Sequence, residues 1–128
     1  MRNTRHLAVL GVVAAFLLAG CSNNTGPVAG ALNVSISSPQ QDDGALMLSV
    51  YGGPVDSVES VGFPVYSIRS PDSVKFIVTG SLGSGTVARI HIPDGRQASR
   101  YSAKVGQVAA QVSYAPRDPA TYSIILLP

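Results

Sequence analysis

The chain has 128 residues, of which 45% are hydrophobic and 12% are charged, with one cysteine and no tryptophan. This length is typical of a single domain, and a lone cysteine excludes a disulfide within the chain. The nine basic and seven acidic residues are scattered along the sequence. No basic stripe exists to neutralise phosphates, so nucleic-acid binding is not expected.

The first twenty residues are typical of an export signal. Arg2 and Arg5 form a basic start, and an apolar run without charge or proline follows at 7–18. A helix that crosses a bilayer needs about 20 apolar residues, so this run has the length of a signal-peptide core instead. The alternative, a buried helix of the folded domain, requires the basic start, the apolar run and the small-residue exit to coincide by chance.

The exit from the apolar run is an aliphatic residue, two small residues and a cysteine: Leu18, Ala19, Gly20 and Cys21. This motif resembles the lipobox of bacterial lipoproteins. The resemblance implies that the Cys21 thiol takes a diacylglycerol, that residues 1–20 are removed, and that the new amine is acylated. One acyl chain holds a protein only marginally, whereas two or more hold it stably. The alternative is an ordinary secreted protein with one free thiol.

The resemblance also bears on location. Ser22 follows the cysteine where inner-membrane lipoproteins of two-membrane bacteria often carry aspartate. In a host with two membranes we therefore expect an outer-membrane lipoprotein, on either the periplasmic or the surface face. The export signal carries Arg2 and Arg5, so the processed chain has seven basic and seven acidic residues and no net charge.

Residues 21–30 are interpreted as a lipidated flexible tether, because they are small, polar or turn-forming and lack a hydrophobic period. A flexible segment of this length spans about 15–18 Å. The membrane is therefore the first expected partner, and the domain is expected to work close to it.

Residues 31–128 alternate between apolar and polar side chains in short runs separated by glycine and proline, as half-buried strands do. No run shows the 3.6-residue period of a helix. Strands are predicted at 32–36, 46–50, 55–61, 65–69, 74–79, 86–92, 100–105 and 122–127, and 107–111 is either a helical turn or a bulged strand. The predicted fold is all-β, a single antiparallel β-sandwich.

The clearest predicted pairing joins 74–79 to 86–92 as a hairpin whose turn is the glycine-rich segment 80–85. This register sets Phe76 opposite Ile90 in the core, and Lys75 beside His91 on the other face. Residues 116–119 are predicted to be a loop. Residues 122–127 are apolar on both faces and are predicted to lie deep in a sheet.

The two strands and the glycine turn between them resemble those of cohesin-like and immunoglobulin-like sandwiches. The resemblance covers about 80 residues without a diagnostic motif and implies the sandwich fold alone. Dockerin binding is not carried over to this chain.

No catalytic constellation is found. After processing, His91 is the only histidine, and no Gly-x-Ser-x-Gly motif supplies a nucleophile. The alternative is that His91 acts as a general base or a metal ligand, but zinc sites draw on several histidines or cysteines. The segment 80–85 lacks the phosphate-binding glycine patterns. We therefore interpret His91 as a surface residue and expect a non-enzymatic protein without a cofactor.

Four acidic residues form a weaker candidate site. Asp42 and Asp43, with Asp56 and Glu59, could gather oxygen ligands for calcium, but their spacing matches no calcium loop. A solvated loop is the preferred interpretation, and no metal site is predicted.

Tyr51, Tyr66 and Tyr114 could stack on a sugar, although tyrosines at sheet edges are the commoner case. The expected function is protein–protein contact by a lipid-anchored envelope protein. The alternative is a carbohydrate-binding module, so the expected partner is an envelope protein or a glycan.

Overall fold

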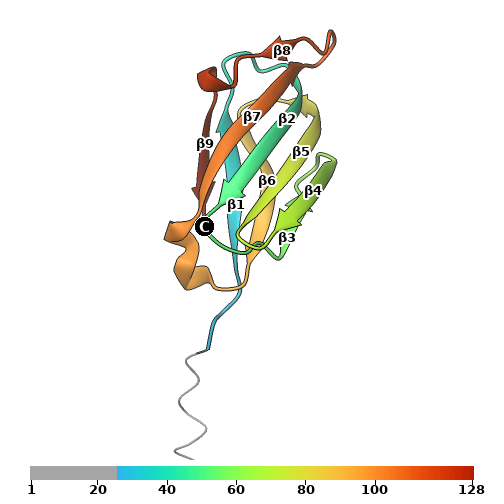
Figure 1. Cartoon of the computed structure of the whole chain (residues 1–128). Coiled ribbons are helices and arrows are strands. Elements are labelled where there is room, and N and C mark those ends of the chain that lie inside the picture. Colours follow the sequence, from blue (N-terminus) through green and yellow to red (C-terminus); the bar gives the residue numbers. More distant parts are fainter. Residues whose placement is uncertain (1–25) are drawn as a thin grey trace, which may run out of the picture.

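The computed structural model describes residues 26–128, which form two packed layers of antiparallel strands (Figure 1). The elements in chain order are β1 (Gly30–Ser37), β2 (Asp43–Tyr51), β3 (Ser57–Ser60), β4 (Val65–Ser70), β5 (Ser73–Leu82), β6 (Gly85–Ile92), the 3₁₀ helix η1 (Gly95–Arg100), β7 (Ser102–Ala110), β8 (Pro116–Arg117), the 3₁₀ helix η2 (Pro119–Thr121) and β9 (Ser123–Leu127). The all-β sandwich prediction is confirmed. The predicted signal helix and the motif ending at Cys21 lie outside the described residues.

One sheet has four strands in the order β3-β6-β1-β9, and the other has five in the order β4-β5-β2-β7-β8. Alternate side chains of each sheet point into the space between them. Leu46, Leu48 and Val50 of β2 are all fully buried, as are Val34 of β1 and Ile90 of β6. Burying each such side chain contributes about 1.5–3 kcal/mol. The predicted alternation therefore marks the core correctly.

The sandwich has two distinct ends (Figure 1). We call the end at which the chain enters β1 the entering end. There Gly95 of η1 donates its N–H to the carbonyl oxygen of Val28 at 2.7 Å, which fixes the chain just before β1. The far end carries the β1–β2 loop, the β7–β8 hairpin and η2. Because β2 has nine residues, the ends lie about 30 Å apart at about 3.4 Å per residue.

Strands β5 and β6 do not form the predicted hairpin. β5 lies between β4 and β2 in one sheet, whereas β6 lies between β3 and β1 in the other. Phe76 and Ile90 are both buried, but they belong to opposite sheets. The link at Gly83 and Ser84 is therefore an arch between sheets and not a hairpin turn. An arch and a hairpin both send alternate side chains into the core, so alternation does not distinguish them.

The last strand is an edge strand and not a deep one. β9 pairs only with β1, and Ile125 and Leu127 are exposed on its outer side. Its other side chains, Ile124 and Leu126, pack against the core. Two apolar faces therefore do not imply burial on both faces here. The predicted loop at 116–119 contains the short strand β8 and the start of η2.

Strand β7 extends from Ser102 to Ala110, so the strand alternative is confirmed for 107–110, whereas the bulge of β7 lies at Gly106, just before the predicted segment. Met47 pairs with Gln107 and Leu48 pairs with Val105, so Gly106 has no partner on β2. Val105 is buried, whereas Gly106 and Gln107 are exposed. Two consecutive residues therefore face outward at this point, and one of them has no side chain.

The glycines at 30 and 106 differ in what surrounds them, which yields a stability prediction. A Cβ at Gly30 would lie 2.7 Å from Gly95 Cα, whereas a Cβ at Gly106 would lie 3.5 Å from Met47 O. Gly30→Ala is expected to lower the free energy of unfolding by about 1–3 kcal/mol, because backbone must move. Gly106→Ala is expected to be neutral or to raise it by up to about 1 kcal/mol. Urea denaturation checks both; a larger loss for Gly106→Ala contradicts the packing described.

Candidate functional site

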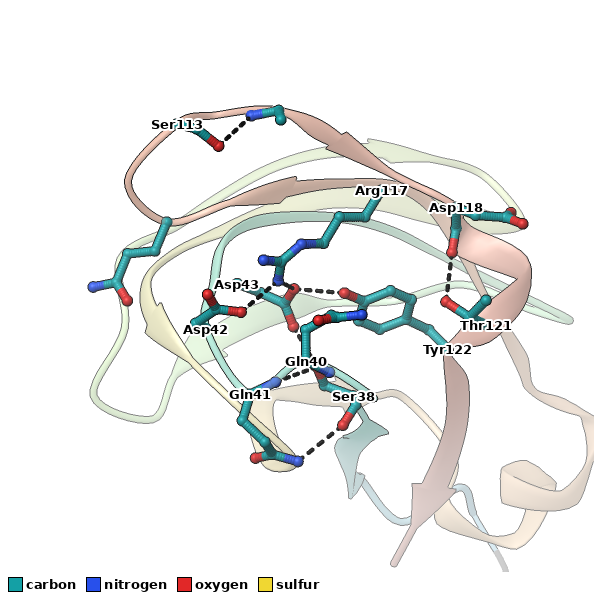
Figure 2. A network of polar contacts seen from close by, with 12 residues as sticks. Ser38, Gln40, Gln41, Asp42, Asp43, Ser113, Arg117, Asp118, Thr121 and Tyr122 are labelled. Atoms are coloured by element: carbon teal, nitrogen blue, oxygen red, sulfur yellow. Dashed lines mark hydrogen bonds and ion pairs between the residues drawn. The ribbon is translucent and has the colours of Figure 1, made fainter.

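A fully buried carboxylate organises the far end (Figure 2). Asp43, the first residue of β2, is 0% exposed. Its oxygens accept hydrogen bonds from Ser38 Oγ at 2.6 Å, Arg117 Nη1 at 2.7 Å and Tyr122 Oη at 2.5 Å. The donors come from the β1–β2 loop, from β8 and from the residue after η2. One side chain thus joins three segments of the chain.

The Asp43 carboxylate is compensated by a cation that stays charged. The hydrogen bond from Arg117 to Asp43 raises the pKa of the guanidinium above its ordinary value. The same Nη1 lies 2.8 Å from Asp42 Oδ1, whose side chain is 63% exposed. The prediction that both aspartates belong to a solvated loop is therefore right for Asp42 and wrong for Asp43.

Tyr122 reaches Asp43 because η2 turns the chain just before it. Asp118 begins this short helix by accepting a hydrogen bond from the Ala120 N–H at 3.0 Å, and the Tyr122 N–H donates to Pro119 O at 3.1 Å. Burial, followed by the hydrogen bond to Asp43, raises the pKa of the Tyr122 hydroxyl. The hydroxyl therefore stays protonated and acts as a donor.

The β1–β2 loop is fastened to the arch between the sheets. Gln41 adopts a left-handed backbone with φ of 64°. Its Nε2 donates to Ser38 O and to Ser84 Oγ, both at 2.8 Å, and its Oε1 accepts from the Ser84 N–H at 3.1 Å. Ser38, a partner of Asp43, is thereby held from two sides.

The chemistry of the network is structural. Each polar contact of Asp43 is made to a side chain of the same end, and no buried side-chain nitrogen or oxygen in residues 26–128 lacks a partner. Breaking a buried ion pair by removing one partner costs about 3–5 kcal/mol, because the other charge remains buried. We call Asp43 and its three donors, Ser38, Arg117 and Tyr122, the clamp of the far end.

A groove of about 460 Å³ lies on the outer face of the five-stranded sheet, beside the clamp. Its floor is formed by outward residues of β2 and β7, and one wall is the β7–β8 hairpin with the start of η2. Its lining includes Met47, Ile77, Gly106, Gln107, Tyr114 and Arg117. Arg117 thus belongs both to the clamp and to the wall of the groove.

The three candidate tyrosines all lie around this face. Tyr66 is on β4 and pairs with Ile77, which pairs with Met47; Tyr51 ends β2. Tyr114 lines the groove, is 74% exposed and adopts a left-handed backbone with φ of 55°. Such a conformation is uncommon for a residue with a Cβ. From the strand spacings, Tyr51 and Tyr66 are about 16 Å apart, so the three rings do not form one stack.

His91 is not beside Lys75, because the two residues belong to different sheets. Its Nε2 lies 2.8 Å from Glu59 Oε2 of the neighbouring strand β3. The weaker calcium grouping is not assembled either. Asp42 and Asp43 are at the far end, whereas Asp56 precedes β3 and bonds through its N–H to His91 O at the entering end. Within residues 26–128, no cluster of three or more potential metal ligands is present.

Comparison with known proteins gives no relative for this chain. No family model matches, and neither a curated protein nor a solved structure matches. No helix within residues 26–128 is long and apolar enough to cross a membrane. The resemblance to cohesin-like or immunoglobulin-like domains therefore stays a prediction beyond the sandwich itself.

The clamp predicts unequal effects for two adjacent aspartates. Asp43→Ala is expected to lower the free energy of unfolding by about 3–5 kcal/mol, because Ser38, Arg117 and Tyr122 all lose the buried carboxylate that they share. Asp42→Ala removes only an exposed partner and is expected to cost at most about 1 kcal/mol. Denaturant titration of both variants checks this; similar losses at the two positions would show that Asp43 is not the centre of the clamp.

The raised pKa of Tyr122 predicts a change of stability at high pH. Because the folded pKa exceeds the unfolded value of about 10, the contribution is present below that value and is lost as pH rises through the folded pKa. Tyr122→Phe removes this contribution and, at neutral pH, is expected to cost about 1–3 kcal/mol. Burial also raises the pKa of Tyr101, which is present in both proteins. The effect of Tyr122 is therefore the difference in unfolding free energy between wild type and Tyr122→Phe.

Unfolding free energies of both proteins, measured between neutral pH and the alkaline limit of folding, supply the test. The difference between wild type and Tyr122→Phe is expected to narrow above about pH 10. A difference in unfolding free energy that stays constant with pH would contradict a stabilising role of the protonated Tyr122 hydroxyl.

Proposed function

We propose that this chain is a lipoprotein of a bacterial envelope, anchored through Cys21, whose sandwich is a non-enzymatic domain that binds another protein. The observation that carries the proposal is the outer face of the five-stranded sheet. There Tyr66 and Ile68 are 66% and 76% exposed, next to Ile77 and the groove. A contiguous exposed apolar surface is typical of an interaction site.

The position of this face suits an anchored protein. The chain enters the sandwich opposite the clamp (Figure 1), and Val28 is the first described residue held to the domain by a backbone hydrogen bond. With Cys21 acylated, the entering end would stand next to the bilayer. The groove would then lie in the half of the domain that is further from the membrane, where an envelope partner can reach it.

Carbohydrate binding is the second candidate function. It is favoured by the presence of Tyr51, Tyr66 and Tyr114 around one face. Because the three rings lie far apart, a glycan would have to be long enough to contact each ring with a different sugar unit. A protein partner uses the apolar surface between the rings as well, so protein binding explains more of the face.

The anchor is tested on protein from its native cells. Intact mass is expected to show a chain that starts at Cys21 and carries acyl groups, and the protein is expected to fractionate with membranes. Cys21→Ser is expected to abolish the acyl mass and the membrane association together. Wild-type protein with an unmodified Cys21, or with residues 1–20 attached, contradicts the anchor.

The binding face is tested by placing a photo-crosslinking amino acid at position 66, with position 33 on the opposite sheet as the matched control. The expected result is one discrete protein adduct from position 66 that an excess of unlabelled domain abolishes. No adduct, or equal adducts from both positions, contradicts a protein partner on this face. Saturable binding of the purified domain to a glycan array, lost in Tyr66→Ala, would favour the carbohydrate alternative.

A further inference from the structure

The groove exists because the β7 bulge places a glycine where an outward side chain would otherwise fill it. Gly106 and Gln107 both face outward, opposite the single residue Met47. Tyr114 and Arg117 form the wall beside this low point. The clamp around Asp43 fixes Arg117, so the wall stands even without a ligand. A preformed hollow of this kind needs little ordering when it is filled.

The apolar floor continues beyond the groove across neighbouring strands. Gln107, Met47, Ile77 and Tyr66 form one row, because each pairs with the next on β7, β2, β5 and β4. Three strand spacings of about 4.8 Å make this row about 14 Å wide. An extended peptide of four or five residues covers that width. A compact ligand would fill the groove but leave Tyr66 exposed.

Cations border the row on the side toward the entering end. Lys75 and Lys104 both pair with Ser49, one from each side, and both are exposed. Neither takes part in an ion pair among residues 26–128. The only acidic residue in the strands of this sheet is Asp43, which is buried in the clamp. The face therefore carries, on one border, two cations that make no ion pair within residues 26–128.

We infer that the groove and its row bind an extended acidic segment of a partner protein. An apolar side chain of the segment enters the hollow at Gly106, and its carboxylates meet Lys75 and Lys104. This inference deepens the proposed protein binding by naming the chemistry of the partner, and it rests on that proposal. Charge complementarity decides the occupant: a second copy of this face would bring lysines against lysines, which disfavours it.

The probe is a displayed library of random ten-residue peptides, selected against the purified residues 22–128 of the chain. Enriched peptides are expected to combine one large apolar residue with at least two acidic residues. Gly106→Leu is expected to weaken their binding at least tenfold, because it fills the hollow at a position where a Cβ makes ordinary contacts. Lys75→Gln with Lys104→Gln is expected to weaken binding and to reduce its dependence on salt.

Matched controls separate the site from general effects. Asn33→Leu adds a similar side chain to the outer face of the four-stranded sheet, and Arg89→Gln with Arg100→Gln removes two cations elsewhere. Both are expected to leave peptide binding unchanged. Circular dichroism and the unfolding midpoint establish that each variant is folded; should Gly106→Leu not fold, Gly106→Ala with Tyr114→Ala takes its place.

The outcomes distinguish this inference from the proposed function. Enriched peptides that are basic, or that bind Gly106→Leu as well as wild type, overturn the groove as the site but leave protein binding in place. No enrichment, together with no adduct from position 66, overturns both. Dimers in sedimentation that Gly106→Leu dissociates would identify a second copy as the occupant. Binding to phosphatidylglycerol vesicles that the lysine variant abolishes would identify a lipid surface. Either result overturns the peptide assignment.

Discussion

The buried Asp43 carboxylate is the constraint on which the far end of the sandwich depends. An ionised group removed from water is tolerated only when its charge and its lone pairs are satisfied, and Ser38, Arg117 and Tyr122 together provide this. Two of these donors lie 74 and 79 residues away along the chain. The clamp therefore joins the first corner of the sandwich to its C-terminal segment, and through Arg117 it also sets one wall of the groove.

The two sheets have different outer surfaces. On the four-stranded sheet, Glu59 contacts His91 and Ser35 bonds to Thr86, and the exposed apolar side chains Ile125 and Leu127 lie on the edge strand β9. On the five-stranded sheet, Lys75 has no ion pair in the described part of the chain, and apolar side chains remain exposed beside it. Polar groups that bond to one another need no partner, whereas a groove continued by exposed apolar side chains and bordered by unpaired charge gains by binding one. This asymmetry is the physical basis for the proposal that the five-stranded sheet binds the partner.

The sequence allowed the strands to be predicted because alternation follows directly from the two-residue period of a strand. It did not reveal which strands pair. The segments containing Phe76 and Ile90 were expected to form a hairpin, yet they lie in opposite sheets, and both arrangements bury the same side chains. The prediction that residues 122–127 lie deep in a sheet is wrong for a related reason. β9 is an edge strand because no strand pairs with its other side, and local sequence does not record a missing neighbour.

The candidate site was predictable only in part. The sequence marks Tyr51, Tyr66 and Tyr114 as tyrosines that could stack on a sugar, and the three lie around one face. The groove was not foreseen, because it requires the unpaired Gly106 to face outward beside the β7–β8 hairpin, and this follows from register alone. The clamp was missed because Asp43 has the same local context as the exposed Asp42. The signal that distinguishes them is Arg117, and only the fold brings it near.

Amide hydrogen exchange in Asp43→Asn is the most direct measurement of the clamp. In the β7–β8 hairpin, the Ala110 N–H donates to Ala115 O at 2.9 Å and the Tyr114 N–H donates to Ala110 O at 3.2 Å. If the clamp holds this hairpin, exchange at both amides should accelerate at least about tenfold, or about 1.4 kcal/mol, while the central residues of β2 stay protected. Unchanged exchange at Ala110 and Tyr114, or the same acceleration throughout the sandwich, would contradict the role assigned to Asp43.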